Sequence, residues 1–136
     1  MGESVLVDAG YIVALLSRRD AHHDWAAAQA AEHGPPWRTC EAALSEAFHL
    51  LGAPGAAAVC ALLSRGALLV GFDLADEMGA VLKLMRKYAD VPISLADACV
   101  VRMTETSSAP LLLTTDSDFR IYRRHGRSVV PCVSPP

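Results

Sequence analysis

The chain has 136 residues, of which 52% are hydrophobic and 20% charged, a composition typical of one compact domain with a substantial core. With a formal net charge of −3, the protein does not attract a polyanion through its overall charge. Any contact with a nucleic acid therefore has to come from a local basic patch. The four cysteines are widely spaced and form no CxxC pair, which favours reduced thiols over disulfides or zinc ligands. We expect a single domain spanning residues 1–136.

The N-terminal sequence MGESVLVDAG has no basic segment ahead of its apolar run, so no secretory signal is predicted. The longest stretch without a charged residue, 47–64, approaches the length of a membrane span. His49 and the sequence Gly52-Ala53-Pro54-Gly55 interrupt it, however, and favour two soluble helices. We therefore expect no membrane segment and a cytoplasmic protein.

Strands and helices alternate along the chain. Apolar runs predict strands at residues 4–7, 37–40, 67–71, 111–114 and 128–131. Helical periodicity and cap residues predict helices at residues 11–16, 20–32, 41–51, then up to 65 after a break at 52–55, and at 74–88 and 95–105. In the helix at 74–88, Met78, Val81, Leu82 and Met85 are expected to share the core face. This alternation predicts an α/β fold with a parallel sheet covered by helices on both faces.

Acidic residues stand where the predicted strands end. Asp8 follows the first strand, and Asp116 and Asp118 follow the strand at 111–114. Asp97 lies in the first turn of a helix, and Glu46 lies on a helix at the border of its apolar face. Because ligands of parallel sheets bind beyond the carboxyl ends of the strands, Asp8, Glu46, Asp97 and Asp116 can face one cleft.

Each acid also has a structural interpretation. Asp8 and Asp116 can be helix N-caps, and Ser94-x-x-Asp97 fits a capping box. Glu46 can be a surface residue at the edge of its apolar stripe. If the acids do converge, they raise each other's pKa or need a cation, and hard divalent ions such as Mg²⁺ or Mn²⁺ take all-oxygen ligands. Such a cluster supports phosphodiester hydrolysis.

Four segments, in this order, give the chain a resemblance to PIN domains, and in particular to short bacterial PIN proteins that are toxins of VapBC-type toxin–antitoxin pairs. The segments are Val5-Leu6-Val7-Asp8 with Ala9-Gly10-Tyr11-Ile12, Ser45-Glu46-Ala47, Leu95-Ala96-Asp97-Ala98, and Leu113-Thr114-Thr115-Asp116-Ser117-Asp118-Phe119. The resemblance implies a three-layer α/β/α sandwich with a central, mainly parallel sheet, and a ribonuclease that requires Mg²⁺ or Mn²⁺. One departure is Asp8-Ala9-Gly10, where a Ser or Thr is frequent in the family shortly after the first acid.

The resemblance also implies the roles of individual residues. Asp8, Glu46, Asp97 and Asp116 are the expected catalytic acids. Asp8, Asp97 and Asp116 are the expected metal ligands, with Asp118 as an auxiliary ligand or organiser of its loop. Thr114 matches a hydroxyl close to the metal.

Basic residues follow the acidic loop. Arg120, Arg123 and Arg124 are candidates for binding RNA phosphates, although the cluster can also be a solvated helix end. Arg18 and Arg19, at the end of the first helix, are a second candidate.

The expected protein is therefore an endoribonuclease toxin silenced by a cognate antitoxin. The alternative is a catalytically silent PIN module that binds nucleic acid or protein. A haloacid dehalogenase-type phosphotransferase is disfavoured, since the required second Asp is replaced by Gly10. A homodimer is expected from the resemblance, with the alanine-rich helices between residues 26 and 63 as its surface.

Overall fold

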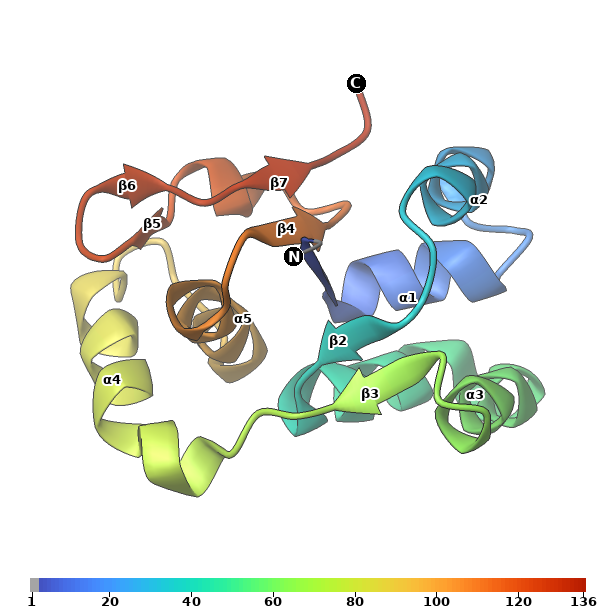
Figure 1. The fold of residues 1–136 in the computed structure, drawn as a ribbon, viewed down its shortest axis with the longest axis horizontal. Coiled ribbons are helices and arrows are strands. Elements are labelled where there is room, and N and C mark those ends of the chain that lie inside the picture. Colours follow the sequence, from blue (N-terminus) through green and yellow to red (C-terminus); the bar gives the residue numbers. More distant parts are fainter. Residues whose placement is uncertain (1–2) are drawn as a thin grey trace.

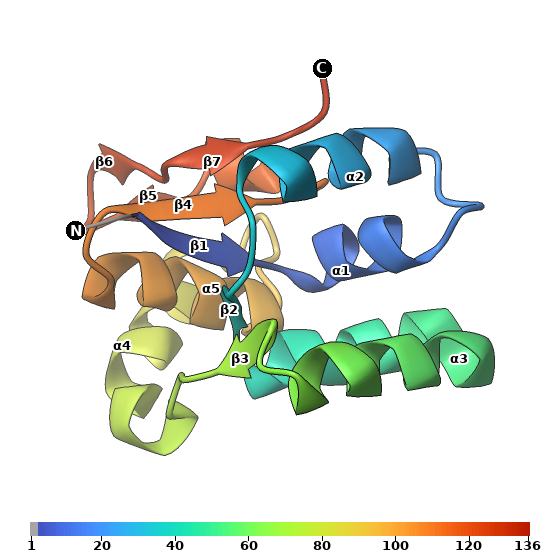
Figure 2. The same cartoon turned by 45° about the vertical axis from the view of Figure 1, so that its right-hand side comes forward.

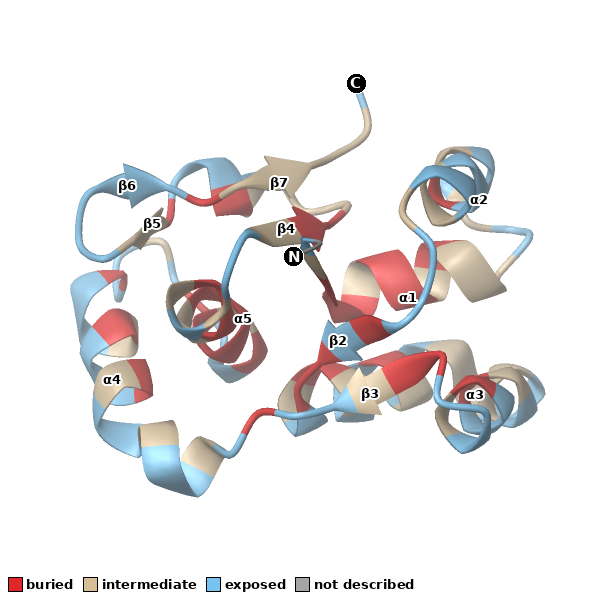
Figure 3. Cartoon of the chain, in the orientation of Figure 1, coloured by how far each residue is buried: buried red, intermediate tan, exposed pale blue. Residues whose placement is uncertain are grey.

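A computed structural model describes residues 3–136 of the chain. Its centre is a parallel sheet with the strand order β3-β2-β1-β4-β7. The strands are β1 (Ser4–Val7), β2 (Trp37–Thr39), β3 (Leu68–Val70), β4 (Pro110–Leu113) and β7 (Cys132–Val133). Leu6 and Val7 of β1 and Leu112 and Leu113 of β4 are buried and belong to the hydrophobic core. Figure 3 colours the ribbon by burial, with buried residues in red.

Helices flank this sheet (Figure 1). They are α1 (Ala9–Leu16), α2 (His23–Glu32), α3 (Glu41–Ser64), α4 (Leu74–Lys87), α5 (Leu95–Thr106) and the short 3₁₀ helix η1 (Ser117–Arg120). Helix α1 packs against α2 and α3, and α5 packs against α4, α3 and the central strands. The central parallel sheet with flanking helices confirms the predicted three-layer α/β/α sandwich.

The C-terminal strands differ from the prediction. A strand was expected at 128–131, but β6 (Ser128–Val129) pairs antiparallel with β5 (Arg123–Arg124) in a separate hairpin. The fifth strand of the main sheet is β7, which pairs with β4 after Pro131. The amide of Leu112 donates to the Pro131 carbonyl at 2.9 Å. A proline that lacks an N–H group still serves as an acceptor on an edge strand, so Pro131 does not end the pairing with β4.

Helix α3 contains the predicted break. Gly52 has φ +67° and ψ −168°, which kinks the element into two helical segments with Pro54 just beyond the kink. This left-handed φ favours glycine. By length and composition α3 is the one helix of residues 3–136 that could cross a membrane. The kink and the packing of α3 against α1 and α5 fit a helix of the domain instead.

The core face of α4 is rotated from the predicted one. Val81 and Leu84 are buried and Met85 is half-buried, but Met78 and Leu82 are 40% and 41% exposed. The helix packs on α5 through a stripe that continues from Val81 and Leu84 to Tyr88, at spacings of three and four residues. The interpretation of Met78 and Leu82 as core residues is therefore wrong.

Candidate active site

The acidic site lies at the point where the strand order of the sheet reverses. Strands β2 and β3 lie on one side of β1, and strands β4 and β7 lie on its other side. In the β1–β4 pair Val7 is level with Leu113, so the two strands end side by side (Figure 2). Such a switch point opens a crevice beyond the strand ends. Asp8 and Thr114 are the first residues after these ends.

Asp8 is buried and is held by two donors. The amide of Tyr11 donates to Oδ1 at 2.9 Å, so Asp8 is also the N-cap of α1. The hydroxyl of Thr114, 106 residues later in the chain, donates to Oδ2. The predicted cap and the predicted position at the cleft therefore both hold for Asp8, and Thr114 fixes its carboxylate from the neighbouring strand.

The loop after β4 is ordered by its own hydroxyl and carboxylate groups. The amide of Asp116 donates to Thr114 Oγ1 at 3.0 Å, and the amide of Asp118 donates to Asp116 Oδ1 at 2.9 Å. Asp116 is thus the N-cap of η1. Thr114 links Asp8 and Asp116 through one hydroxyl group.

Asp97 enters the site from α5. Its amide donates to the Ser94 hydroxyl at 3.0 Å, which gives one of the two hydrogen bonds of the predicted capping box. Its carboxylate Oδ2 accepts a hydrogen bond of 3.3 Å from the hydroxyl of Tyr122. Tyr122 is fully buried and packs edge-on against Tyr88 and Phe119. The orientation of Asp97 is therefore set by a side chain that follows the acidic loop.

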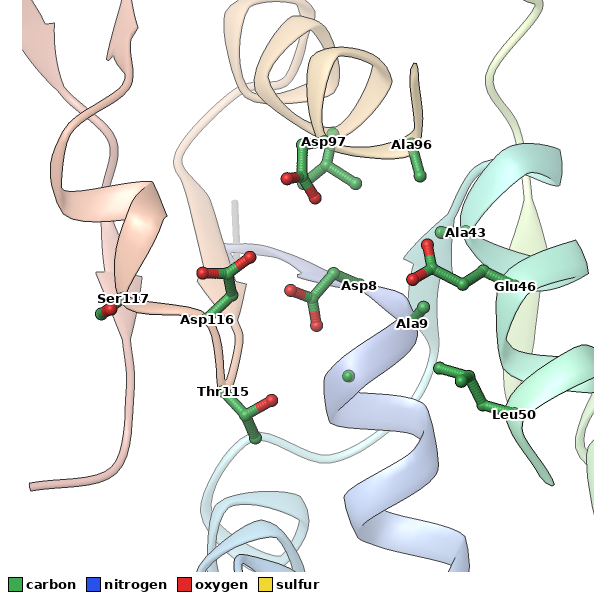
Figure 4. A pocket seen from close by; sticks show the side chains of 12 residues that line it. Asp8, Ala9, Ala43, Glu46, Leu50, Ala96, Asp97, Thr115, Asp116 and Ser117 are labelled. Carbon is green, nitrogen blue, oxygen red and sulfur yellow. The ribbon is translucent and has the colours of Figure 1, made fainter. Parts of the chain in front are cut away.

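These acids share a cavity of about 380 Å³. Figure 4 shows the carboxylates of Asp8, Asp97, Asp116 and Glu46 facing the same space. Glu46 is exposed and reaches the rim from the first half of α3. Asp118 and Thr114 lie next to the cavity but do not line it. The lining residues are Asp8, Ala9, Gly10, Ala43, Glu46, Leu50, Ala96, Asp97, Val100, Thr115, Asp116 and Ser117.

The cavity perturbs two of its acids. Burial, and to a smaller extent the charges of Asp97 and Asp116, raise the pKa of Asp8 to about 7. Burial and the charge of Asp116 raise the pKa of Asp97 to about 6. The hydrogen bonds from Thr114 to Asp8 and from Tyr122 to Asp97 lower these pKa values in part. Carboxyls crowded in this way hold negative charge at a cost that a cation relieves.

The donor chemistry of the cavity fits a hard divalent cation, because all four acidic side chains offer carboxylate oxygens. In the described range 3–136, no three His, Cys, Asp or Glu side chains converge closely enough to ligate one ion as they stand. The acids therefore share a cavity without forming a closed coordination shell.

Two residues of the site were not predicted. Tyr122 is 25 positions from Asp97, and no local pattern signals their contact. Thr115 Oγ1 lies only 2.5 Å from the position that a Cβ at residue 10 would take, so Gly10 makes room for this hydroxyl. The signal in the sequence that could have identified Thr115 is its place between two expected site residues, Thr114 and Asp116. The space beside Asp8 is thus occupied by a hydroxyl from the loop that follows β4.

The three arginines expected to bind RNA make contacts within the domain. Arg120 donates to the Ser134 hydroxyl at 2.8 Å. One guanidinium nitrogen of Arg123 donates to the carbonyls of residues 120–122. Arg124 donates to the Thr104 carbonyl, and its Nε is buried without a hydrogen-bond partner. Arg120 is exposed, whereas Arg123 and Arg124 are half-buried, so Arg120 is the most accessible of the three.

The fold and site define an α/β protein with an acidic cavity at the switch point of a parallel sheet. The PIN domain family model matches residues 5–124, and the chain therefore belongs to the PIN domain family. None of the curated protein sequences is a match for it. Among solved structures, the crystal structure of VapC20 from Mycobacterium tuberculosis, a sarcin-ricin loop cleaving toxin, is similar in fold. It has 24% sequence identity and a TM-score of 0.76, and the match covers 85% of this chain and 92% of VapC20.

Proposed function

We propose that this protein is a metal-dependent endoribonuclease of the VapC type, which hydrolyses RNA phosphodiester bonds as the toxin of a toxin–antitoxin pair. The observation that carries the proposal is the gathering of four carboxylates, from four separate elements, in one cavity at the carboxyl end of the sheet. Membership of the PIN domain family and the fold shared with VapC20, a sarcin-ricin loop cleaving toxin, support it.

Asp8, Asp97 and Asp116 are the residues that would hold Mg²⁺ or Mn²⁺, with Asp118 as an auxiliary ligand. When bound, the ion supplies a water of lowered pKa and neutralises charge on the scissile phosphate. The Thr114 hydroxyl binds both the Asp8 carboxylate and the Asp116 amide, and the Tyr122 hydroxyl binds the Asp97 carboxylate. These hydrogen bonds fix the positions of the acids relative to one another.

Glu46 has a different part in the proposed reaction. It is exposed at the cavity rim, opposite the buried Asp8. A carboxylate in contact with solvent is suited to orient the attacking water and to accept its proton. Arg120, Arg123 and Arg124 are the proposed contacts of the RNA backbone next to η1, and Arg120 has the most accessible guanidinium group.

The remaining parts of the proposal concern the binding partners of the protein, its oligomeric state and its subcellular location. A cognate antitoxin would silence the enzyme, a homodimer would be its working form, and the cytoplasm its location. The exposed, apolar second half of α3, which includes Ala53, Ala57 and Ala61, is the proposed dimer surface.

The proposal is tested by incubating a structured RNA with the purified protein in Mn²⁺ and in chelator. Wild type is expected to cleave only in Mn²⁺. Asp116→Asn should lose at least ~10–100-fold in rate, the loss typical of outer-shell partners of a metal, because it removes the charge of a proposed ligand. Asp24→Asn, which changes an exposed acid on α2, is the matched control and should cleave like wild type.

Equal cleavage by Asp116→Asn and Asp24→Asn would contradict the assignment of the site. RNA binding by wild type without any cleavage in Mn²⁺ would favour the silent PIN module instead.

A further inference from the structure

A second cavity lies along α1 and α3, two of the helices that help to wall the acidic one. It measures about 470 Å³ and is lined by the end of α1, the turn after it and the kink of α3. Its lining residues are Leu16, Ser17, Arg18, Arg19, Leu51, Pro54 and Gly55. Ala9 and Gly10, at the start of α1, line the acidic cavity, as do Ala43, Glu46 and Leu50 of α3.

The two cavities therefore follow one another along the α1–α3 pair. On α3, Leu50 lines the first cavity and its neighbour Leu51 lines the second. Helix α1 has eight residues and so separates its two ends by ~12 Å. Pro54 and Gly55, which follow the kink at Gly52, line the second cavity.

The charges of the two cavities are opposite. The first has four acidic side chains in its lining, and the second has Arg18 and Arg19 and no acid. Both arginines are exposed. Within residues 3–136, neither guanidinium group has a hydrogen-bond or ion-pair partner, unlike those of Arg120, Arg123 and Arg124. The N–H donors of both guanidinium groups are thus not used by other groups of residues 3–136.

We propose that Arg18 and Arg19 bind backbone phosphates of single-stranded RNA that leaves the acidic cavity along the α1–α3 groove. This inference rests on the proposed function, because it takes RNA as the substrate. Carboxylates in the first cavity repel the phosphates that flank the scissile bond, so the strand needs cations nearby. Guanidinium groups bind phosphate oxygens in a bidentate manner, and exposed ones do so with little loss of hydration.

The test measures binding without catalysis. A fluorescently labelled single-stranded RNA of mixed sequence is titrated with the full chain in chelator at several salt concentrations. Two lost phosphate contacts should make the slope of log K against log salt shallower by about 1.4, at ~0.7 per contact on a single strand. Arg18→Ala/Arg19→Ala should therefore bind about tenfold more weakly at low salt and show this shallower slope.

Two further variants separate charge from fold. Arg65→Ala/Arg86→Ala removes two exposed arginines that line neither cavity, and it should keep the slope of wild type. Arg18→Lys/Arg19→Lys keeps the charges and should restore most of the slope, while thermal unfolding shows that all variants are folded. In Mn²⁺, Arg18→Ala/Arg19→Ala should raise KM and leave kcat unchanged, since the arginines do not touch the reacting atoms.

Identical slopes for Arg18→Ala/Arg19→Ala and Arg65→Ala/Arg86→Ala would overturn the inference. This result is distinct from failure of the proposed function, in which wild type fails to cleave RNA in Mn²⁺ whatever its affinity in chelator.

Discussion

The Asp8 carboxylate is buried with other acids nearby, and this has a consequence for stability. Its pKa is about 7 in the folded protein and returns to about 3.8 when unfolding exposes it. Between these values the folded state binds the proton and the unfolded state releases it. Rising pH therefore favours unfolding across this window, by up to ~1.4 kcal/mol per pH unit from this one group.

We predict that the metal-free protein loses stability through Asp8 as the pH rises from about 3.8 to about 7, and that Asp8→Asn removes this loss. The asparagine side chain keeps an acceptor for the Tyr11 amide but does not ionise. The measurement is the free energy of unfolding by denaturant, in chelator, at several pH values for both proteins. The stability of the variant relative to wild type should rise with pH and level off above the pKa of Asp8. A constant difference would contradict the perturbed carboxyl.

Tyr122 offers a second prediction for a single atom. Its hydroxyl donates to Asp97 and lowers the pKa of that carboxyl, against the larger effect of burial. Tyr122→Phe keeps the ring among Tyr88 and Phe119. The pKa of Asp97 should therefore rise above about 6 while the fold is retained, as measured by NMR titration of its carboxyl carbon in the metal-free protein.

Tyr88→Phe is the matched control for this titration. The Tyr88 hydroxyl accepts from the Arg123 amide and makes no contact with Asp97. Its removal should leave the Asp97 titration unchanged. A shift of equal size in both variants would show that the aromatic cluster acts through packing and not through the hydrogen bond.

Among the helices, α3 lines both cavities, and its kink depends on one residue, Gly52. Gly52→Ala places a Cβ on a backbone with φ +67° and ψ −168°, a region that is essentially restricted to glycine, and this costs about 1–3 kcal/mol. Gly79→Ala in α4 is the control, since a Cβ there meets nothing within 4 Å and φ is ordinary. It should stabilise the protein by up to about 1 kcal/mol. Thermal unfolding of both variants gives the comparison, and a Gly52→Ala protein as stable as wild type would contradict the kink.

The elements that could be predicted are those that local patterns specify. The strand before Asp8 and the glycine break in α3 have clear local signals, and both are present. The pairing of β7 with β4 could not be read locally, because Pro131 resembles a strand terminator and only its carbonyl is used. The face of α4 was misjudged at Met78 and Leu82, since periodicity alone does not show which part of a wide apolar stripe meets α5.

The same division applies to the candidate site. Asp8, Asp97 and Asp116 follow strand ends or begin helices, so their convergence could be expected from the topology of a parallel sheet. Side-chain contacts between distant segments, such as Tyr122 with Asp97, depend on packing that no sequence spacing shows. The hydrogen bonds of Arg123 to backbone carbonyls were hidden for the same reason.

For the molecule as a whole, the proposed ion should act as a stabilising ligand. A ligand present at about a hundred times its Kd adds ~2.7 kcal/mol to the stability of the folded state. We predict that Mn²⁺ raises the Tm of wild type and of Asp24→Asn, and that Asp116→Asn shows a much smaller rise. The increase should be larger above about pH 7 than at about pH 5, because Asp8 must lose its proton to bind the ion. Equal shifts in all three proteins would place the ion outside the cavity.

The hydrogen bond between Thr114 and Asp8 joins residues 106 positions apart. At translation rates of roughly 5–20 residues per second, ~5–20 s pass between the synthesis of the two. During that interval the growing polypeptide lacks the Thr114 hydroxyl that fixes the Asp8 carboxylate, and it also lacks Asp116. The proposed metal site therefore cannot be assembled on a nascent chain that has not yet reached Asp116.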